Sequence, residues 1–354
     1  MNMDKLFRIK STKENQENLK KNGICGLENM CNTCYLNSAI QCFRYNPFLY
    51  EYFKDNHHTR HLNESAHPAV QNFVTSWRRL LCDFWNHNER IIRPVEFFTS
   101  FQRLCIAKNK RELIGFNQND AEEFMQFIID CIHESIQIII PPSKIIVKGD
   151  VVTPTDQLMK DYCEYYSKYQ NSEGVSPMKQ QYGGVYCSSI KNTYDDKCSN
   201  SFEPFVYVNL VIDGLKKKDS IMNAFDNFTT PEKLDGYKSE DDPKPENTVF
   251  YKQTNFISLP EYLIIVLKRF SFNMRTGHPS KINTVLSIPT HIDMEPYCVG
   301  YEIKNTEYRL NAICNHSGGL SSGHYYAYVK NTNEDWILFN DDKYDKVDKQ
   351  TMNK

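Results

Sequence analysis

The sequence predicts an α+β fold, because its hydrophobic periodicity is helical in the first part of the chain and strand-like in the second. Apolar residues recur at helical spacing in three stretches before residue 135, and they alternate or run together in short stretches after residue 182. The chain has 354 residues, of which 40% are hydrophobic and 24% charged, so it can bury a sizeable core.

Three helices are expected in the first part. The first opens at Cys34, carries an apolar stripe from Leu36 to Phe43 and should stop at Pro47. The second covers residues 70–85, and the third begins at Asn119 or Asp120, either of which can cap it. Residues 1–22 are polar and lysine-rich, and we expect them to form a flexible tail.

The later part of the chain reads as strands. Alternation or a continuous apolar run predicts strands near residues 205–212, 254–259, 262–267, 309–315, 324–330 and 336–339. The unbroken apolar run at 262–267 is typical of a central strand. Residues 331–335 form the polar turn between the last two strands, and residues 238–247 form an exposed loop.

Charge and cysteine usage exclude several classes of protein. Lysine plus arginine number 42 against 44 acidic residues, which argues against a nucleic-acid-binding chain. No apolar run is long enough to insert into a membrane, and the start has no secretory signal, so we expect a cytoplasmic or nuclear location. The twelve cysteines should then be thiols. Only Cys31 and Cys34 have metal-type spacing, so we expect no metal and no cofactor.

Cys34 is the best-placed candidate nucleophile. It follows a turn-prone stretch and opens a helix, where backbone N–H groups and the helix dipole favour a thiolate. Asn29, five residues earlier, is an amide that can point at a reacting carbonyl. The alternative is that Cys34 is only a packing residue.

His324 is the matching candidate base. It begins a strand after the glycine- and serine-rich loop 316–323. If the following hairpin turns between Thr332 and Asn333, the residue opposite His324 lies between 340 and 342, where the sequence reads Asn-Asp-Asp. An amide or carboxylate there would fix the tautomer of the ring. The alternative is a surface histidine beside unrelated acids.

Four stretches carry a resemblance to a known family. Residues 26–41 (GLENMCNTCYLNSAIQ) resemble the cysteine box of the ubiquitin-specific proteases, and residues 323–329 (GHYYAYV) with 336–341 (WILFND) resemble their histidine box. Between them, residues 118–124 (QNDAEEF) resemble the internal Gln-Asp box, and residues 259–270 resemble the strand before the second half. The motifs stand in the family's order from about residue 23 to residue 347.

The resemblance implies a papain-like cysteine protease with thumb, palm and fingers. A single catalytic domain would cover residues 23–350, with the thumb at about 23–135, the fingers at about 183–255 and the palm in the remainder. The protein would be a deubiquitinase that hydrolyses the bond after the C-terminal glycine of ubiquitin through a thioester. Cys34 would be the nucleophile, His324 the base and Asn340 the residue that orients it, with Asn29 and Asp341 as oxyanion donor and polar support.

The resemblance also implies a binding site for the ubiquitin tail. Asp120 would pair with the arginines of the tail, with Gln118 as its polar neighbour, and Tyr325 and His316 would border a channel that fits two glycines. Asp120 could instead serve only as a helix cap, and Tyr325 only as sheet packing. The expected partners are ubiquitin and ubiquitinated proteins, and the chain is expected to be a monomer.

Two departures from the family pattern stand out. Cys31 occupies a position where the family often has glycine, and a disulfide between it and Cys34 would abolish activity. The positions of the family's zinc cysteines fall near Asn192, Asp195, Ser239 and Asp242, so we expect the fingers to be held by strand pairing and packing alone. Two alternatives remain open: an inactive ubiquitin-binding module, and an enzyme for a ubiquitin-like modifier.

Overall fold

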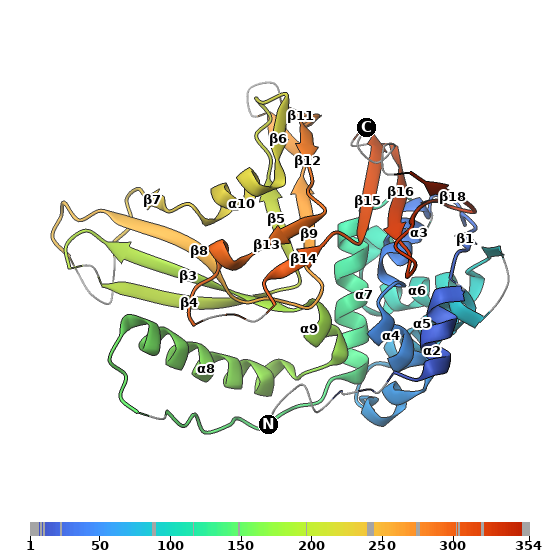
Figure 1. The fold of residues 1–354 in the computed structure, drawn as a ribbon, viewed down its shortest axis with the longest axis horizontal. Coiled ribbons are helices and arrows are strands. Elements are labelled where there is room, and N and C mark those ends of the chain that lie inside the picture. Colours follow the sequence, from blue (N-terminus) through green and yellow to red (C-terminus); the bar gives the residue numbers. More distant parts are fainter. Residues whose placement is uncertain are drawn as a thin grey trace. The chain divides into compact units, whose positions relative to one another are not determined.

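The computed structural model describes residues 7, 9, 11–21, 23–86, 90–115, 117–147, 149–195, 197–238, 244–273, 277–301, 303, 305–319 and 322–348. The chain divides into two compact units, Met1–Ile138 with Asn311–Lys354, and Ile139–Leu310. Helices dominate the first half of the chain and strands the second, so the predicted α+β class is confirmed (Figure 1). Within these described ranges no helix has the length and apolar composition of a membrane span.

The first unit is rich in helices. They are α2 (Lys13–Lys21), α3 (Cys34–Phe43), α4 (Pro47–Lys54), α5 (Pro68–Asn86), α6 (Val95–Ala107) and α7 (Ala121–Ile136), with 3-10 turns η1 (His57–His61) and η2 (Arg111–Leu113). Three of them, α3, α5 and α7, lie on the amphipathic stripes that the sequence predicts. Pro47 is the first residue of α4, a position where its missing N–H costs nothing. Asp120, rather than Asn119, caps α7 by accepting the N–H of Glu122 at 2.7 Å.

Part of the expected N-terminal tail is helical. Helix α2 lies within residues 1–22, and its Asn15 is buried and donates to the Asp55 carboxylate at 3.0 Å. The Thr332 hydroxyl donates to the carbonyl of Leu19. Polar contacts therefore help to fix this helix beside the single buried Leu19, and one apolar residue makes no periodic pattern in the sequence.

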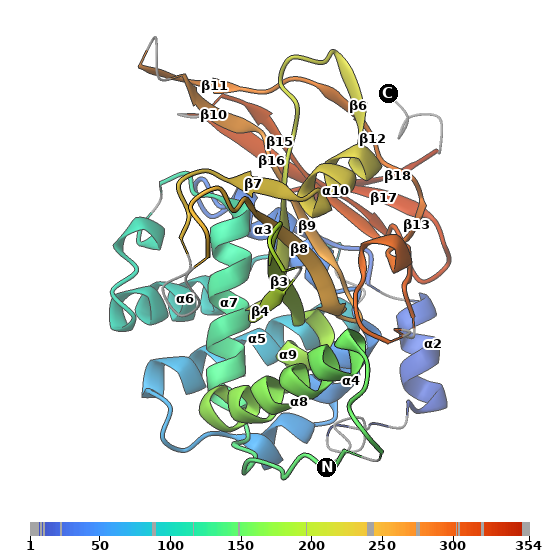
Figure 2. The ribbon, with the colours of Figure 1, turned by 90° about the vertical axis from the view of Figure 1, so that its left-hand side faces the viewer.

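A four-stranded antiparallel sheet completes the first unit. Its order is β15 (Ala312–Gly318), β16 (Gly323–Lys330), β17 (Trp336–Asn340) and β18 (Lys343–Val347), and α3 packs on β16 (Figure 2). Ala327 and Phe339 are fully buried on paired strands. The short strands β1 (Gly26–Leu27) and β2 (Ile91–Ile92) pair in parallel beside the start of α3.

The second unit consists mainly of strands. Its helices are α8 (Pro154–Glu173), α9 (Pro177–Tyr182) and α10 (Ile221–Thr229), with the 3-10 turn η3 (Glu295–Tyr297). Its strands are β3 (Gly184–Asn192), β4 (Cys198–Phe205), β5 (Tyr207–Val211), β6 (Lys218–Ser220), β7 (Glu232–Leu234), β8 (Phe250–Ser258), β9 (Ile264–Lys268), β10 (Phe270–Asn273), β11 (His278–Lys281), β12 (Val285–Ser287), β13 (His291–Asp293) and β14 (Glu307–Arg309). The largest sheet has the order β4-β3-β8-β7.

The apolar run at 262–267 is not a central strand. It forms β9, which pairs in parallel with β5 in a two-stranded sheet of the described residues. Ile265 and Leu267 are half-buried and pack against the core around Val208 and Leu210. A continuous apolar run reports contact on both faces of a strand, and it does not report how many neighbouring strands there are.

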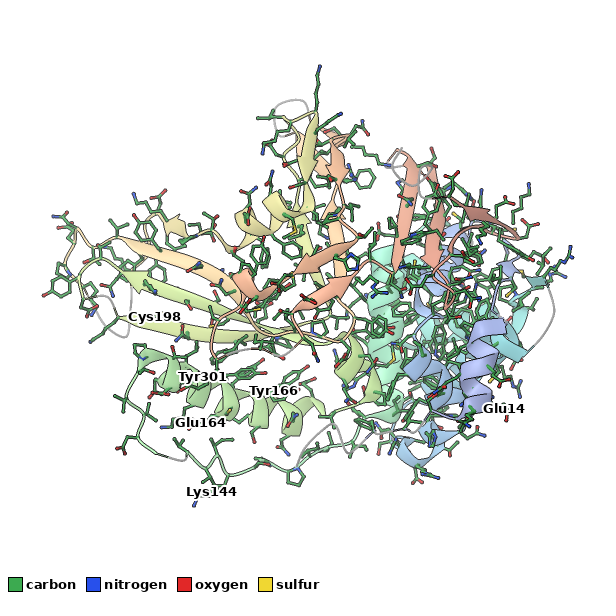
Figure 3. All side chains as sticks on the ribbon, viewed as in Figure 1. Glu14, Lys144, Glu164, Tyr166, Cys198 and Tyr301 are labelled. Carbon is green, nitrogen blue, oxygen red and sulfur yellow. The ribbon has the colours of Figure 1, made fainter. Side chains whose placement is uncertain are left out.

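Tyrosines attach helix α8 to the large sheet. Tyr162 and Tyr166 stack at 5.6 Å and pack against Val185, Cys187 and Ile257 of the sheet. Figure 3 labels Tyr166 on the side of α8 that faces β4. The fold of this unit therefore depends on aromatic contacts as well as on strand pairing.

The tip of the β3–β4 hairpin carries a polar network. Asp195 accepts the Asn192 amide at 2.8 Å and the Lys244 ammonium at 2.6 Å, and these bonds hold the pKa of its carboxyl well below the usual range. Side-chain hydrogen bonds therefore stabilise this hairpin tip in addition to strand pairing. The sequence analysis predicted that strand pairing and packing alone would hold the fingers. Ser239 and Asp242 lie outside the described residues.

Candidate active site

Cys34 is the first residue of α3, as predicted. The chain reaches it through two successive left-handed residues, Cys31 at φ 71° and Asn32 at φ 54°. The Asn29 side-chain oxygen accepts the N–H of Thr33 at 3.1 Å and so closes the turn before the helix. Cys31 is exposed whereas Cys34 is buried, and both are free thiols.

The environment of Cys34 raises the pKa of its thiol. Burial raises its pKa, and the Asp341 carboxylate raises it further. The backbone N–H groups of Tyr325, Tyr35 and Cys34 itself donate to the sulfur and act in the opposite direction. The backbone donors at the helix start thus favour a thiolate, as the sequence predicts, but loss of water around the sulfur outweighs them and raises the pKa.

His324 and Asn340 form a direct pair. The Nε2 atom of His324 lies 2.6 Å from Oδ1 of Asn340, the short distance of a strong hydrogen bond. The Asn340 oxygen can only accept, so Nε2 carries the proton and the lone pair is on Nδ1. Pairing of Ala327 with Phe339 places residue 342 opposite His324, within the range 340–342 predicted from the turn.

The nucleophile and the base lie on neighbouring elements. Helix α3 packs on β16, and the Cys34 sulfur accepts the backbone N–H of Tyr325, the residue directly after His324. The sulfur near the front of the chain therefore meets the strand that carries the imidazole near its end. The sequence interpretation required the sulfur and the imidazole themselves to come within contact distance, and that closer meeting stays a prediction.

Asp341 is the polar centre of the site. Its two carboxylate oxygens accept the amides of Asn29 at 2.9 Å and Asn37 at 2.8 Å, and Oδ2 lies 4.0 Å from Nε2 of His324. Its backbone carbonyl accepts the N–H of Leu27 at 2.8 Å. Asn29 thus keeps only one amide N–H for an oxyanion. Sequence reasoning missed Asn37, although its place one turn after Cys34 on α3 was a signal.

The predicted tail-binding residues gather at the start of β16. Asp120 accepts Glu122 N–H through Oδ1 and the Tyr325 hydroxyl, at 3.2 Å, through Oδ2. The rings of Tyr325 and His316 are 4.6 Å apart on paired strands. The cap and packing roles of Asp120 and Tyr325 are therefore present, and their contact with a tail stays a prediction. Residues 320 and 321 of the adjoining loop lie outside the described residues.

Gln118 makes two hydrogen bonds with one residue of its own chain. Its Oε1 accepts the N–H of Gly323 at 2.9 Å, and its Nε2 donates to the carbonyl of Gly323 at 3.0 Å. The sequence analysis predicted that Gln118, as the polar neighbour of Asp120, contacts the ubiquitin tail. In the structure the Gln118 amide is hydrogen-bonded to Gly323, the residue directly before His324.

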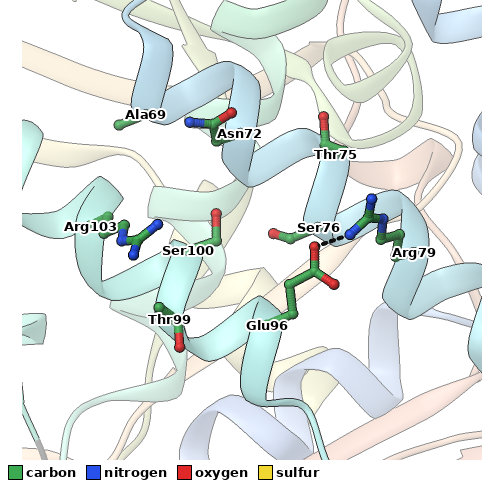
Figure 4. Close-up of a pocket in the computed structure, with 9 residues that line it drawn as sticks. All are labelled: Ala69, Asn72, Thr75, Ser76, Arg79, Glu96, Thr99, Ser100 and Arg103. Carbon is green, nitrogen blue, oxygen red and sulfur yellow. Dashed lines mark hydrogen bonds and ion pairs between the residues drawn. The ribbon is translucent and has the colours of Figure 1, made fainter.

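A separate groove of about 580 Å³ lies between α5 and α6 (Figure 4). It is lined by hydroxyl, amide and charged side chains, and Arg79 is paired there with Glu96. The predicted catalytic residues are not part of its lining. The groove is therefore separate from the predicted catalytic residues.

A cysteine at a helix start, an imidazole of fixed tautomer and an orienting amide on an α+β fold are typical of thiol hydrolases. A family model described as ubiquitin carboxyl-terminal hydrolase matches residues 25–354, and the chain belongs to this family. The predicted family is thereby confirmed, and the predicted enzyme class, a cysteine-type ubiquitin hydrolase, is the class of this family.

Individual relatives agree with the family match. The chain is 28% identical over 332 residues to ubiquitin carboxyl-terminal hydrolase Usp2 of Drosophila melanogaster, covering 91% of this chain and 33% of the relative. It is also 28% identical to human ubiquitin carboxyl-terminal hydrolase 2, covering 90% and 51%. The chain thus spans about a third to a half of the length of these relatives.

A solved structure shares the fold. It is the SAGA Ubp8/Sgf11/Sus1/Sgf73 DUB module bound to ubiquitin aldehyde, with a TM-score of 0.71 and 23% sequence identity. The match covers 94% of this chain and 67% of that chain. This likeness supports the fold assignment.

Proposed function

We propose that this chain is a thiol-dependent deubiquitinase that hydrolyses the isopeptide or peptide bond after the C-terminal glycine of ubiquitin. One arrangement carries the proposal. The Cys34 sulfur lies beside the backbone N–H of Tyr325, and the preceding residue, His324, is hydrogen-bonded to Asn340. Family membership and the relatives named hydrolases of ubiquitin support the substrate. The solved module that shares the fold is described as bound to ubiquitin aldehyde.

The reaction begins from a neutral thiol. Because burial raises the pKa of Cys34, the sulfur gives its proton to Nδ1 of His324 as it attacks the glycine carbonyl. The free N–H of the Asn29 amide can donate to the oxyanion. The carbon–nitrogen bond then breaks, the imidazolium returns the proton to the leaving lysine amine, and a thioester remains on Cys34.

Water completes the cycle. His324, neutral again, takes a proton from a water molecule, and the resulting hydroxide attacks the thioester carbonyl. The carbon–sulfur bond breaks, the thiolate recovers the proton, and the carboxylate of ubiquitin departs. Asn340 holds the ring through both steps but adds no negative charge, so the imidazolium is balanced by the thiolate and by Asp341, 4.0 Å from Nε2.

The ubiquitin tail would lie beside the start of β16. Asp120 keeps carboxylate lone pairs beyond those used by Glu122 and Tyr325, and arginine side chains of the tail are suited to them. Tyr325 and His316 present paired rings that would border the two glycines. We propose ubiquitin and ubiquitinated proteins as the partners.

The test is a pair of measurements on Cys34→Ala. The variant should lose cleavage of a ubiquitin C-terminal fluorogenic amide while it still binds ubiquitin, and an electrophilic ubiquitin probe should label the native chain at Cys34 alone. Retained turnover in the variant would overturn the assignment. Binding of ubiquitin by the native chain without adduct or turnover would identify an inactive binding module, and preference in a panel of modifiers would identify a ubiquitin-like substrate.

A further inference from the structure

The first residues of β16 extend beyond the end of β17. Pairing with β17 runs from Ala327–Phe339 to Lys330–Trp336, whereas pairing with β15 continues to Gly318–Gly323. In an antiparallel ladder, alternate residues of a strand direct both N–H and C=O to the same neighbour. Gly323 and Tyr325 share the parity of Ala327, so their backbone groups point to the side where β17 has already ended.

Two side chains take the place of the missing strand. The Gln118 amide pairs with both the N–H and the C=O of Gly323, at 2.9 and 3.0 Å, as a residue of a neighbouring strand would. The N–H of Tyr325 donates to the Cys34 sulfur. His324 lies between Gly323 and Tyr325, and the Gln118 amide holds the backbone directly before it.

The Gly323 backbone depends on these two hydrogen bonds more than the backbone of a residue with a side chain would. A Cβ atom at this position would overlap the His316 ring and the carbonyl of Ser317, so no side chain can fix the backbone here. Glycine also has the largest backbone freedom to lose on folding. The two bonds from Gln118 remove that freedom directly before the catalytic histidine.

We propose that Gln118 is a positioning residue that fixes His324 through Gly323, an inference that rests on the proposed function. The sequence interpretation placed Gln118 on the ubiquitin tail. The two roles differ in kinetics, because a tail contact acts on substrate binding whereas a positioning contact acts on the chemical step. The two roles also differ when ubiquitin is absent. A positioning contact still affects the reactivity of the Cys34 thiol, whereas a tail contact does not.

The first experiment compares Gln118→Leu with Gln71→Leu. Gln71 also donates two hydrogen bonds to backbone, to the carbonyls of Asn63 and Ala66 at 3.2 and 3.4 Å, but it lies on α5, away from the predicted site residues in the sequence. With a ubiquitin fluorogenic amide, Gln118→Leu should lower kcat about tenfold or more with KM within about twofold, since small misplacements of a base are costly. Gln71→Leu should change neither. A raised KM with unchanged kcat would overturn the proposal and favour the tail contact.

The second experiment needs no ubiquitin. Iodoacetamide labelling near neutral pH, mapped to single cysteines, measures the reactivity that His324 confers on Cys34, with the exposed Cys31 as a control in the same molecule. Gln118→Leu should slow labelling of Cys34 several-fold, towards the rate of His324→Ala, and leave Cys31 unchanged. An unchanged rate at Cys34 would overturn the positioning role. Failure of the native chain to cleave ubiquitin would instead count against the proposed function, and this labelling result would still decide on Gln118.

Discussion

His58 should make the first unit sensitive to acid. It lies in η1 with 6% of its surface exposed, and its ring packs on Phe53 with the centroids 5.3 Å apart. Nδ1 is buried and finds no hydrogen-bond partner among the described residues. Burial, with smaller contributions from Arg78 and His57, lowers the pKa of His58 from 6.5 to about 4.

The sign and size of the effect follow from linkage. In the folded state His58 stays neutral down to about pH 4, whereas in the unfolded state it takes a proton below about pH 6.5. The unfolded state thus binds more protons in this window, and stability is lost as the pH falls through it. At about 1.4 kcal/mol per pH unit, the loss reaches about 2 kcal/mol at pH 5 and about 3 kcal/mol below pH 4.

Tryptophan fluorescence isolates the unit that contains His58. The three tryptophans, Trp77, Trp85 and Trp336, all belong to the first unit. Urea unfolding of the native chain and of His58→Phe, followed at about pH 7.5 and about pH 5, should show the variant gaining about 2 kcal/mol on the native chain between the two conditions. Carboxylates common to both proteins cancel in this comparison. A stability difference between the two proteins that is the same at both pH values would refute the reasoning.

Four further substitutions have expected outcomes. Asn340→Ala removes the 2.6 Å bond to His324 and should lower kcat about 10²-fold with a fluorogenic ubiquitin amide; a normal kcat would contradict the orienting role. Asp120→Ala should raise KM about tenfold and, through the lost helix cap, lower the unfolding free energy by about 1 kcal/mol; titration and urea unfolding measure the two effects. Cys31→Gly relieves a non-glycine residue at φ 71° and should raise the unfolding free energy by about 1 kcal/mol, and a loss would contradict the strain. Gly26→Ala forces a Cβ into the backbone of Asp342 and should cost about 2 kcal/mol, with activity lost at the same time.

Local signals predicted a large part of the fold and the site. The apolar stripe of α3 and the carboxylate of Asp120 fixed two helix starts, because both depend on neighbours within one turn. Counting across one hairpin turn predicted an amide or carboxylate from residues 340–342 beside His324, and the family resemblance selected Asn340 among them. Such features need no knowledge of distant contacts.

The features that were missed depend on partners far along the chain. Helix α2 is hydrogen-bonded through Asn15 to Asp55 at the end of α4 and through Leu19 to Thr332 in the turn before β17. Apolar periodicity in the sequence gives no sign of such bonds. Gln118 meets Gly323 across 205 residues. The raised pKa of Cys34 could not be predicted for the same reason: a helix start is visible in the sequence, whereas burial of the sulfur follows only from the packing of α3 on β16.

Asp341 joins the segment that carries Cys34 to the segment that carries His324 and Asn340, although the two lie about 300 residues apart in the sequence. The Leu27 N–H, the Asn29 amide and the Asn37 amide all converge on this residue, at 2.8, 2.9 and 2.8 Å. They anchor the turn before Cys34 and the first turn of α3 to the end of β17, one residue beyond Asn340. Any shift of the nucleophile relative to the base must therefore break several of these bonds together. A carboxylate suits this role because it accepts from several donors at once, and its cost is visible in the raised pKa of Cys34. Burial first, and then the same charge that assembles the site, raise the pKa of the sulfur, so the proposed mechanism relies on His324 as its base.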